Sequence, residues 1–290
     1  MSLDDNRIMG SPIQGEGERK ITPGFTSFFR DLYMHSTIIY SIIPDYKAKQ
    51  KKPIKIASVG CSTGEELYSL VLANWESRYE LEFHGYDAYE PRIARARKGE
   101  YVLKAEPNAA TKTGPFWEPV KRYANQELGI EIPSELVEVI KEDETKERIK
   151  ITEEVKQRVS FSIHNFLDAP LPQKYNVICL QNVMNHLSPE EQETALNNIY
   201  ESLEDGGWLL VDGIQQTSAF KVVDDPKHAP IMHKHGFYEA KFRLRNRGAI
   251  FDQIEFKSYR KGQCDPVTPV NNKLYRIDPF KPRVDKYAYR

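Results

Sequence analysis

The stretch Ile56–Leu70, IASVGCSTGEELYSL, decides the fold class. Its apolar start is typical of a buried strand, its middle is a small polar turn with two glycines, and its end has helical spacing. The segments ELEFHGYDA and EPRIARARKGEY that follow predict a second strand, ending at Asp87, and a second helix. Strands that alternate with helices are typical of a parallel sheet. We therefore predict an α/β fold with a mostly parallel, twisted sheet and helices on both faces.

The second half of the chain resumes this alternation. VSFSIHNFLD and YNVICLQNVM predict strands, and the second is apolar throughout, as expected where both faces of a sheet are covered. SPEEQETALNNIYESLEDGG predicts a helix that has Ser188 as its N-cap and stops at Gly206. WLLVDG predicts another strand. Residues 237–261 predict a C-terminal antiparallel hairpin with its turn near Asn246–Gly248.

The chain divides into four parts by composition. Residues 1–20 are polar and predict a flexible tail, and residues 21–50 predict a short helical segment whose apolar spacing begins at Phe25 and whose run is stopped by Pro44. Residues 51–263 form the main domain, and residues 264–290 an irregular extension rich in proline, tyrosine and basic residues. Residues 101–150 break the alternation. We expect them to be an insertion with small elements of its own and a place for partner recognition.

Composition limits the function classes. The 290 residues are 40% hydrophobic and 29% charged with a formal net charge of -1, which indicates an ordinary soluble globular protein without a field that attracts nucleic acid. We find neither a signal-peptide pattern nor an apolar run long enough for membrane insertion. The three cysteines are too far apart for a disulfide framework, so we expect a reduced, cytoplasmic protein. The histidines of HAPIMHKHGF lack a further ligand at a suitable spacing, so we expect no metal.

The turn after the first strand has the wrong charge for a phosphate. It lacks the GK[ST] of a P-loop, and Glu65 and Glu66 would repel a pyrophosphate. Acids at this place suit a ligand with a positive charge and hydroxyl groups, and S-adenosylmethionine has both. Asp87 follows Gly64 by 23 residues, the spacing at which an acid after the second strand reaches a ribose. The alternative is that Gly60 and Gly64 only shape a tight turn and that Asp87 caps a helix.

Five stretches in this order resemble the chemotaxis-receptor methyltransferases, the CheR-type protein-glutamate O-methyltransferases. Together they span about residues 22–215. The resemblance implies a Rossmann-like class I methyltransferase fold with S-adenosylmethionine as cofactor and S-adenosylhomocysteine as product. The stretches are FTSFFRD, GCSTGEELYSL, HGYDAYEPRIARARKGEY, VSFSIHNFLD and YNVICLQNVMNHLSPEEQETALNNIYESLEDGGWLLVDG.

The resemblance also implies a cofactor-binding set, which combines charged, polar and aromatic side chains around the glycine turn. A guanidinium suits a carboxylate, and a phenylalanine ring offers an apolar face to a purine. The set comprises Thr26 and Arg30 for the methionyl carboxylate, Gly60 and Gly64 for the turn, Glu65 for the ammonium or sulfonium, Asp87 for the ribose, Asn165 and Phe166 for the adenine, and Gln181, Asn182 and Val183 near the methyl group.

Simpler interpretations exist for several members of this set. Phe28 and Phe29, like Phe25, suit a hydrophobic core as well as a site. Arg30 would also suit a surface ion pair, which contributes little. Asn165 would also satisfy a turn.

The chain departs from the family pattern mainly on the acceptor side. Gln181 stands where the family has an arginine, His186 where it has a tyrosine, and Ile214 where a histidine usually begins the motif after the fifth strand. Gly24 stands in place of an asparagine, and residues 1–20 contain no counterpart of the family's helical N-terminal domain. A carboxylate acceptor favours a nearby arginine, so these departures concern the identity of the acceptor.

Three functions follow, with Arg30, Gln181 and His186 as the candidate catalytic residues. The first is methyl transfer to a glutamate carboxylate of a protein partner. The second is methyl transfer by the same fold to another acceptor, for which His186 would act as a base unless it is an ordinary loop histidine. The third is a non-catalytic module that binds the cofactor or its product and signals through partners. The sequence does not predict an oligomeric state.

Overall fold

The computed structural model describes residues 26–49, 52–104, 116–143 and 146–211, and the backbone of four short strands within 237–261. The predicted tail at 1–20 and the extension at 264–290 lie outside these residues, as do Phe25 and the histidines of HAPIMHKHGF. None of the described helices is long and apolar enough to cross a membrane.

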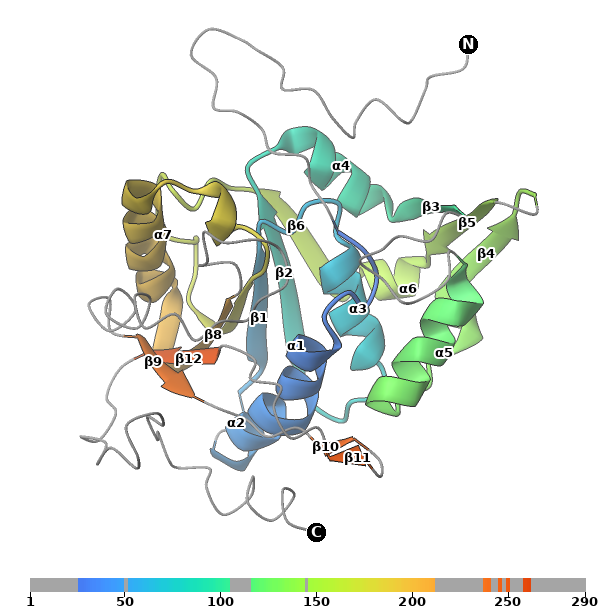
Figure 1. Ribbon diagram of the computed structural model, residues 1–290, viewed down its shortest axis with the longest axis horizontal. Helices are drawn as coiled ribbons and strands as arrows, with labels where there is room; N and C mark the ends of the chain where they lie inside the picture. The colour runs from blue at the N-terminus through green and yellow to red at the C-terminus, as the bar shows by residue number, and fades with distance from the viewer. Residues whose placement is uncertain are drawn as a thin grey trace, which may run out of the picture.

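A seven-stranded sheet forms the centre of the molecule (Figure 1). Its order is β6-β2-β1-β7-β8-β12-β9. Neighbours from β6 to β8 pair in parallel, and β12 pairs antiparallel with β8 and β9. The predicted mostly parallel sheet is confirmed. The strands are β1 (Ile54–Val59), β2 (Leu81–Asp87), β6 (Val159–Ile163), β7 (Tyr175–Leu180), β8 (Leu203–Val211), β9 (Phe237–Ala240) and β12 (Ser258–Lys261).

The strand order reverses between β1 and β7. From β1 the chain moves outward through β2 to β6, and it then returns to start β7 on the other side of β1. Ligands of open α/β sheets bind outside the carboxyl ends of the strands at such a switch point. The topology therefore places a site where the residues after Val59 and after Leu180 meet.

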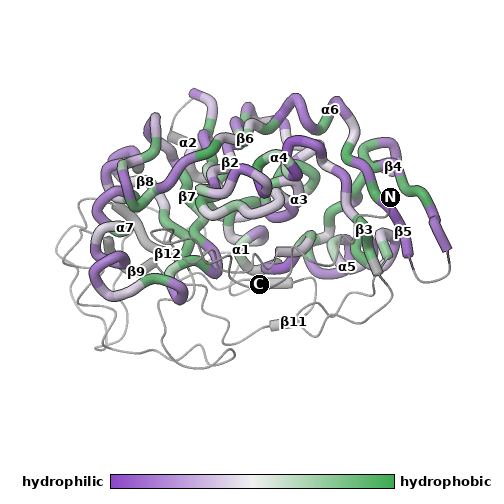
Figure 2. The backbone as a smooth tube through the Cα atoms, turned by 90° about the horizontal axis from the view of Figure 1, so that it is seen from above, coloured by the Kyte–Doolittle hydropathy of each residue, from purple (hydrophilic) through white to green (hydrophobic). Residues whose placement is uncertain are grey.

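Helices cover both faces of the sheet, as predicted (Figure 1). One face packs against α3 (Glu65–Ala73) and α4 (Glu90–Lys98), together with the N-terminal helices, in the larger hydrophobic core. The other face packs against α7 (Pro189–Ser202) in a second core. Every residue of β7 is buried, which confirms the interpretation of its unbroken apolar sequence. Figure 2 shows the apolar stretches gathered in the interior strands.

The N-terminal segment differs from its prediction. The helix begins at Leu32 rather than near Phe25, and it continues past Pro44. It runs as α1 (Leu32–Thr37), a π-helix (Ile38–Ile42) and α2 (Ile43–Lys49). The N–H of Ile43 donates to the carbonyl of Ile38, five residues back. This wider turn directly precedes the proline, where the ordinary four-residue ladder would lack one N–H donor.

The segment after α4 carries a separate antiparallel sheet (Figure 1). Its order is β3-β5-β4, and Tyr101 of β3 pairs with Ile149 of β5. Tyr101, Ile149 and Trp117 belong to the same core as α3, so this inserted sheet is packed onto the main domain. Its elements are β3 (Glu100–Lys104), α5 (Trp117–Leu128), the 3-10 turn Ser134–Leu136, β4 (Val137–Lys141) and β5 (Lys146–Ile151), and α6 (Glu153–Lys156) leads on to β6.

The helix α7 confirms its predicted first boundary and corrects its predicted last one. Ser188 caps α7 in a capping box, in which its hydroxyl accepts from the N–H of Glu191 and its own N–H donates to the Glu191 carboxylate. The helix ends at Ser202, before Gly206, because β8 already begins at Leu203. Gly206 instead has a φ of 71° inside β8, where the pairing with β7 is irregular.

The predicted hairpin is confirmed in the described backbone. β9 pairs antiparallel with β12, and β10 (Arg245–Asn246) pairs antiparallel with β11 (Ala249–Ile250). Asn246 pairs with Ala249, and the rest of the turn predicted near Asn246–Gly248 lies outside the described residues.

Candidate functional site

The turn after β1 is built from left-handed backbone conformations. Gly60, Ser62 and Gly64 have φ angles of 71°, 51° and 93°. The N–H groups of Gly60 and Cys61 both donate to the carbonyl of Tyr86, and the N–H of Ser62 donates to Asp87 Oδ2 at 2.9 Å. The neighbouring strand β2 therefore holds the turn in a conformation that is strained at Ser62.

Gly60 brings the ends of β1 and β7 together. A Cβ atom at Gly60 would lie 2.5 Å from Val183 Cγ2, so only glycine allows this approach. Gly64 has a different neighbourhood, because a Cβ there would lie 2.9 Å from the side chains of Ala96 and Phe161. Gly60 thus joins the two halves of the switch point, whereas Gly64 lets α3 pack against α4 and β6.

The FTSFFRD segment reaches the same place from the N-terminal side. Arg30 Nη2 donates to Asn182 Oδ1 at 2.8 Å, although 152 residues separate them. Phe29, which precedes Arg30 in the chain, and Asn182 itself have positive φ angles of 52° and 54°. The N–H of Phe29 is held by Ser69 Oγ on α3 at 2.9 Å. Strained backbone that is held by long-range contacts often marks a functional site.

The two acids at the start of α3 have different surroundings. Glu65 is 8% exposed, and its Oε2 accepts a hydrogen bond from Thr63 Oγ1 at 2.6 Å. Burial raises the pKa of Glu65, and the hydrogen bonds from Thr63 and from the Glu65 backbone, together with the charge of Arg95, oppose this only in part. Glu66 Oε1 instead accepts from Ser58 Oγ of β1 at 2.8 Å. Glu65 is therefore the acid whose charge is costly in the absence of a cation.

Asp87 organises the next loop. Its Oδ2 accepts the N–H of Ser62, its Oδ1 accepts the N–H of Tyr89 at 2.9 Å, and Arg92 Nη1 lies 3.8 Å away. The turn-shaping alternative thus holds in part, because Asp87 does order the start of α4. Each carboxylate oxygen keeps a second lone pair, so two hydroxyl groups of a ribose can still be accepted.

The two residues expected at the adenine are largely occupied by the protein. Asn165 Nδ2 donates to Asp168 Oδ2, and its Oδ1 accepts the N–H of Leu167, so both polar ends serve the local turn. The ring of Phe166 belongs to the second core and is 8% exposed. Both nevertheless follow β6, beside Asp87, whose carbonyl accepts the N–H of His164.

Gln181 directly follows β7, and its side-chain amide is only partly hydrogen-bonded within the described residues. Its Nε2 donates to the carbonyl of Leu210 on β8 at 3.1 Å. Its Oε1 is buried and has no hydrogen-bond partner among the described residues. A buried oxygen without a donor is unfavourable by about 1–3 kcal/mol, so a bound molecule that donates here would be stabilised.

The remaining nominated residues lie on the border of the site. His186 ends the short 3-10 turn after Asn182, and partial burial and the charge of Arg92 lower its pKa, which favours a neutral ring. Thr26 is partly buried at the start of the described chain. Sequence reasoning did not nominate Ser62, Arg92 or Tyr101. Ser62 lies between two nominated residues in the chain, and Tyr101 ends one of the stretches that resemble the family, but neither position by itself indicated a contact with the turn.

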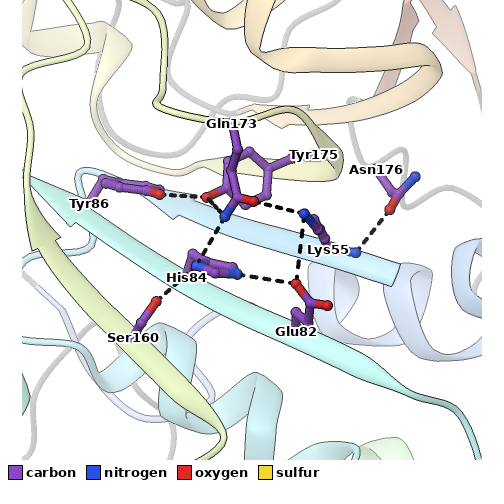
Figure 3. Close-up of polar contacts among 8 residues, drawn as sticks. All are labelled: Lys55, Glu82, His84, Tyr86, Ser160, Gln173, Tyr175 and Asn176. Atoms are coloured by element: carbon purple, nitrogen blue, oxygen red, sulfur yellow. Dashed lines mark hydrogen bonds and ion pairs between the residues drawn. The ribbon is translucent and has the colours of Figure 1, made fainter. Parts of the chain in front are cut away.

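A second polar group lies at the opposite end of the strands (Figure 3). Lys55 Nζ donates to Gln173 Oε1 at 2.8 Å, Gln173 Nε2 donates to the hydroxyl of Tyr175, and His84 Nδ1 lies 2.8 Å from Ser160 Oγ. Lys55, Ser160 and Tyr175 lie at or next to the starts of β1, β6 and β7, Gln173 precedes β7, and His84 lies within β2, whereas the candidate site lies where strands end. The described residues contain no group of three that could hold a metal ion.

The corner at the ends of β1, β2 and β7 thus fits S-adenosylmethionine. One switch point brings together a buried carboxyl that favours a cation, a second carboxylate with spare lone pairs, and a buried oxygen that lacks a partner within the part of the chain that the structure describes. The family described as CheR methyltransferase, SAM binding domain, matches residues 24–109 and 120–227. The chain belongs to this family. The family resemblance is therefore confirmed, as is S-adenosylmethionine as the cofactor of the matched domain.

Curated relatives of this CheR domain carry chemotaxis names. The chemotaxis protein methyltransferase of Vibrio parahaemolyticus is 28% identical over 194 residues, 66% of this chain and 64% of that protein. Chemotaxis protein methyltransferase 1 of Vibrio cholerae is 29% identical over 195 residues, with the same coverage. The chain therefore spans less than two thirds of the length of these relatives. The N-methyltransferase NodS of Bradyrhizobium japonicum, a solved structure, is 12% identical with a TM-score of 0.42 and covers 81% of this chain and 89% of its own.

Proposed function

We propose that this protein transfers the methyl group of S-adenosylmethionine to the carboxylate of a glutamate side chain on a protein partner. The relatives' names, which say chemotaxis protein methyltransferase, support this acceptor class. The observation that carries the proposal is the contact between Arg30 and Asn182. The guanidinium of Arg30, which the resemblance assigns to the cofactor's carboxylate, lies beside the turn in which Gln181 stands instead of the family's arginine, and in the proposal it also supplies the positive charge that an anionic acceptor needs.

The chemistry needs alignment rather than a base. When bound, the cofactor supplies an electrophilic methyl group, which an acceptor oxygen takes as the sulfur–carbon bond breaks and its electron pair stays on the sulfur. A carboxylate is already ionised, so no proton has to be removed. In the proposal, Glu65 and Asp87 hold the cationic and hydroxyl parts of the cofactor, and the close approach of Gly60 to Val183 keeps the ends of β1 and β7 together. Alignment of this kind can contribute several kcal/mol.

Gln181 favours a second candidate function. One of its two amide N–H groups donates to Leu210, and its carbonyl oxygen is the atom that lacks a partner among the described residues, so that oxygen is the group that a ligand's donor would satisfy. That oxygen would repel a carboxylate and accept a hydrogen bond from an amide, amine or hydroxyl. For such an acceptor the neutral ring of His186 is the available base, because its lowered pKa keeps it unprotonated near neutral pH.

One experiment separates these candidates. The protein is incubated with methyl-labelled S-adenosylmethionine and a helical protein that exposes glutamates, and in parallel with the same protein carrying glutamine at those positions. Label that appears only with the glutamates and is released as methanol by mild alkali supports the ester. Alkali-stable label supports the second candidate. Cofactor binding without turnover on either protein would refute both and favour a non-catalytic binding module.

A further inference from the structure

Tyr101 connects the inserted sheet to the cofactor turn. It is the second residue of β3, it is 3% exposed, and its hydroxyl donates to the carbonyl of Thr63 at 2.7 Å. Burial raises the pKa of the Tyr101 phenol well above its ordinary value, and the nearby Glu65 charge adds to this. The phenol is therefore protonated and donates this hydrogen bond throughout the physiological pH range.

Thr63 is the residue of the turn whose carbonyl is held by the inserted sheet. It stands between Ser62 and Gly64, which both have left-handed backbones. The neighbours are held by the central sheet and by the turn itself, because Ser62 donates to Asp87 and the N–H of Gly64 donates to the carbonyl of Cys61. The carbonyl of Thr63 is held by Tyr101. Without that donor, the carbonyl would lose a hydrogen bond next to a strained residue.

The same threonine continues the connection to the cofactor side. Thr63 Oγ1 donates to Glu65 Oε2 at 2.6 Å. Two hydrogen bonds therefore link the Tyr101 hydroxyl, through one residue, to the carboxylate proposed to bind the cationic part of the cofactor. A shift of Thr63 would change both the shape of the turn and the position of that carboxylate.

Aromatic packing fixes the Tyr101 ring. Its centroid lies 5.0 Å from that of Phe28 in an edge-to-face contact at 88°. Phe28 makes a second edge-to-face contact, at 5.4 Å, with Trp117 of α5. Phe28 also precedes Phe29 and Arg30, which contact α3 and Asn182. The inserted segment thus touches both the cofactor turn and the segment that holds the end of β7.

We propose that Tyr101 is a positioning residue, which sets the conformation of the cofactor turn through Thr63 and makes cofactor affinity depend on the inserted sheet. The expected effect on cofactor binding rests on the proposed function, whereas the effect on the turn does not. Tyr101 acts through Thr63 and Glu65, so its loss weakens binding of the cofactor more than it slows the chemical step at saturation.

The test compares Tyr101→Phe with Tyr68→Phe in the full chain. Tyr68 is a matched control because it is fully buried, packs edge-to-face with Tyr101 at 6.4 Å, and donates to a backbone carbonyl, that of Ala96, at 2.9 Å. Both variants lose one buried tyrosine hydrogen bond, so their melting temperatures should fall by similar amounts. Tyr101→Phe alone should weaken S-adenosylmethionine binding, by about three- to tenfold in calorimetric titration.

Amide hydrogen exchange without cofactor provides the second measurement. Tyr101→Phe should accelerate exchange of the Ser62 and Gly64 amides, and Tyr68→Phe should leave them unchanged. Equal exchange of these amides in both variants would overturn the proposal. So would equal cofactor affinities. Accelerated exchange in a protein that binds no cofactor, even unaltered, would support the positioning and refute the proposed function.

A further variant guards against a Tyr101→Phe protein that does not fold. Thr63→Val keeps the tyrosine hydrogen bond and removes the next one, to Glu65. It should weaken cofactor binding by a similar factor and leave the Gly64 amide protected. Unchanged affinity in Thr63→Val would contradict the proposed connection.

Discussion

Replacing Glu65 with glutamine should make the cofactor-free protein more stable and cofactor binding weaker. Glu65 is the first residue of α3, is 8% exposed, and accepts a hydrogen bond from Thr63 that glutamine can also accept. The substitution therefore removes the charge and retains the shape. Opposite effects on stability and affinity are expected because a buried carboxylate is unfavourable alone and favourable beside a cation.

The magnitude follows from the hydrogen bond that the cofactor's ammonium would donate. Hydrogen bonds to charged groups contribute about 1.5–3 kcal/mol and neutral ones about 0.5–1.5 kcal/mol. Glu65→Gln should therefore reduce binding by about 1–2 kcal/mol, which is about five- to thirtyfold in Kd. Calorimetric titration with S-adenosylmethionine measures this directly. Glu66→Gln is the control. It removes an equal charge at the neighbouring position, from a carboxylate that accepts a hydrogen bond from Ser58.

The pH dependence has a definite sign. Burial raises the pKa of Glu65 in the folded protein above its unfolded value. The stability associated with this group is thus fully present below the unfolded pKa and is lost as pH rises through the folded pKa. Glu65→Gln should abolish that loss in thermal melts, while cofactor affinity of the unaltered protein should rise over the same pH range. Unchanged affinity in Glu65→Gln, or equal losses in both glutamine variants, would refute the assignment of Glu65 to a cation.

Two further substitutions, the first with a control variant, test the switch point and the capping of α7. Gly60→Ala should destabilise the protein by about 2–4 kcal/mol and weaken cofactor binding, because its φ is 71° and the new Cβ would lie 2.5 Å from Val183. Gly99→Ala, at a φ of 65° outside the site, should lower the melting temperature without changing affinity, and a loss of affinity there would contradict the argument. Ser188→Ala should reduce the free energy of unfolding by about 1 kcal/mol in urea titration, since it breaks the capping box with Glu191, and an unchanged midpoint would show that this cap contributes nothing.

Local patterns in the sequence were sufficient where the physical cause is local. The alternation of apolar strands with helices predicted the parallel sheet, and the Ser188 cap follows from two residues that are three positions apart. Pro44 and Gly206 were misjudged because their effect depends on what surrounds them. A π-helical turn accommodates the proline, and the pairing of β8 with β7 takes up the glycine.

The sequence by itself determined the fold class, the family, and the turn and acids from which the cofactor was inferred. Tertiary structure decided which of those residues meet. Arg30 and Asn182 are 152 residues apart and Tyr101 and Thr63 are 38 apart, so no local pattern announces either contact. The same structure commits both ends of Asn165 to its own turn. Backbone propensity acts over a few residues, whereas the partners of a polar side chain depend on strand order and register, which the whole chain settles together.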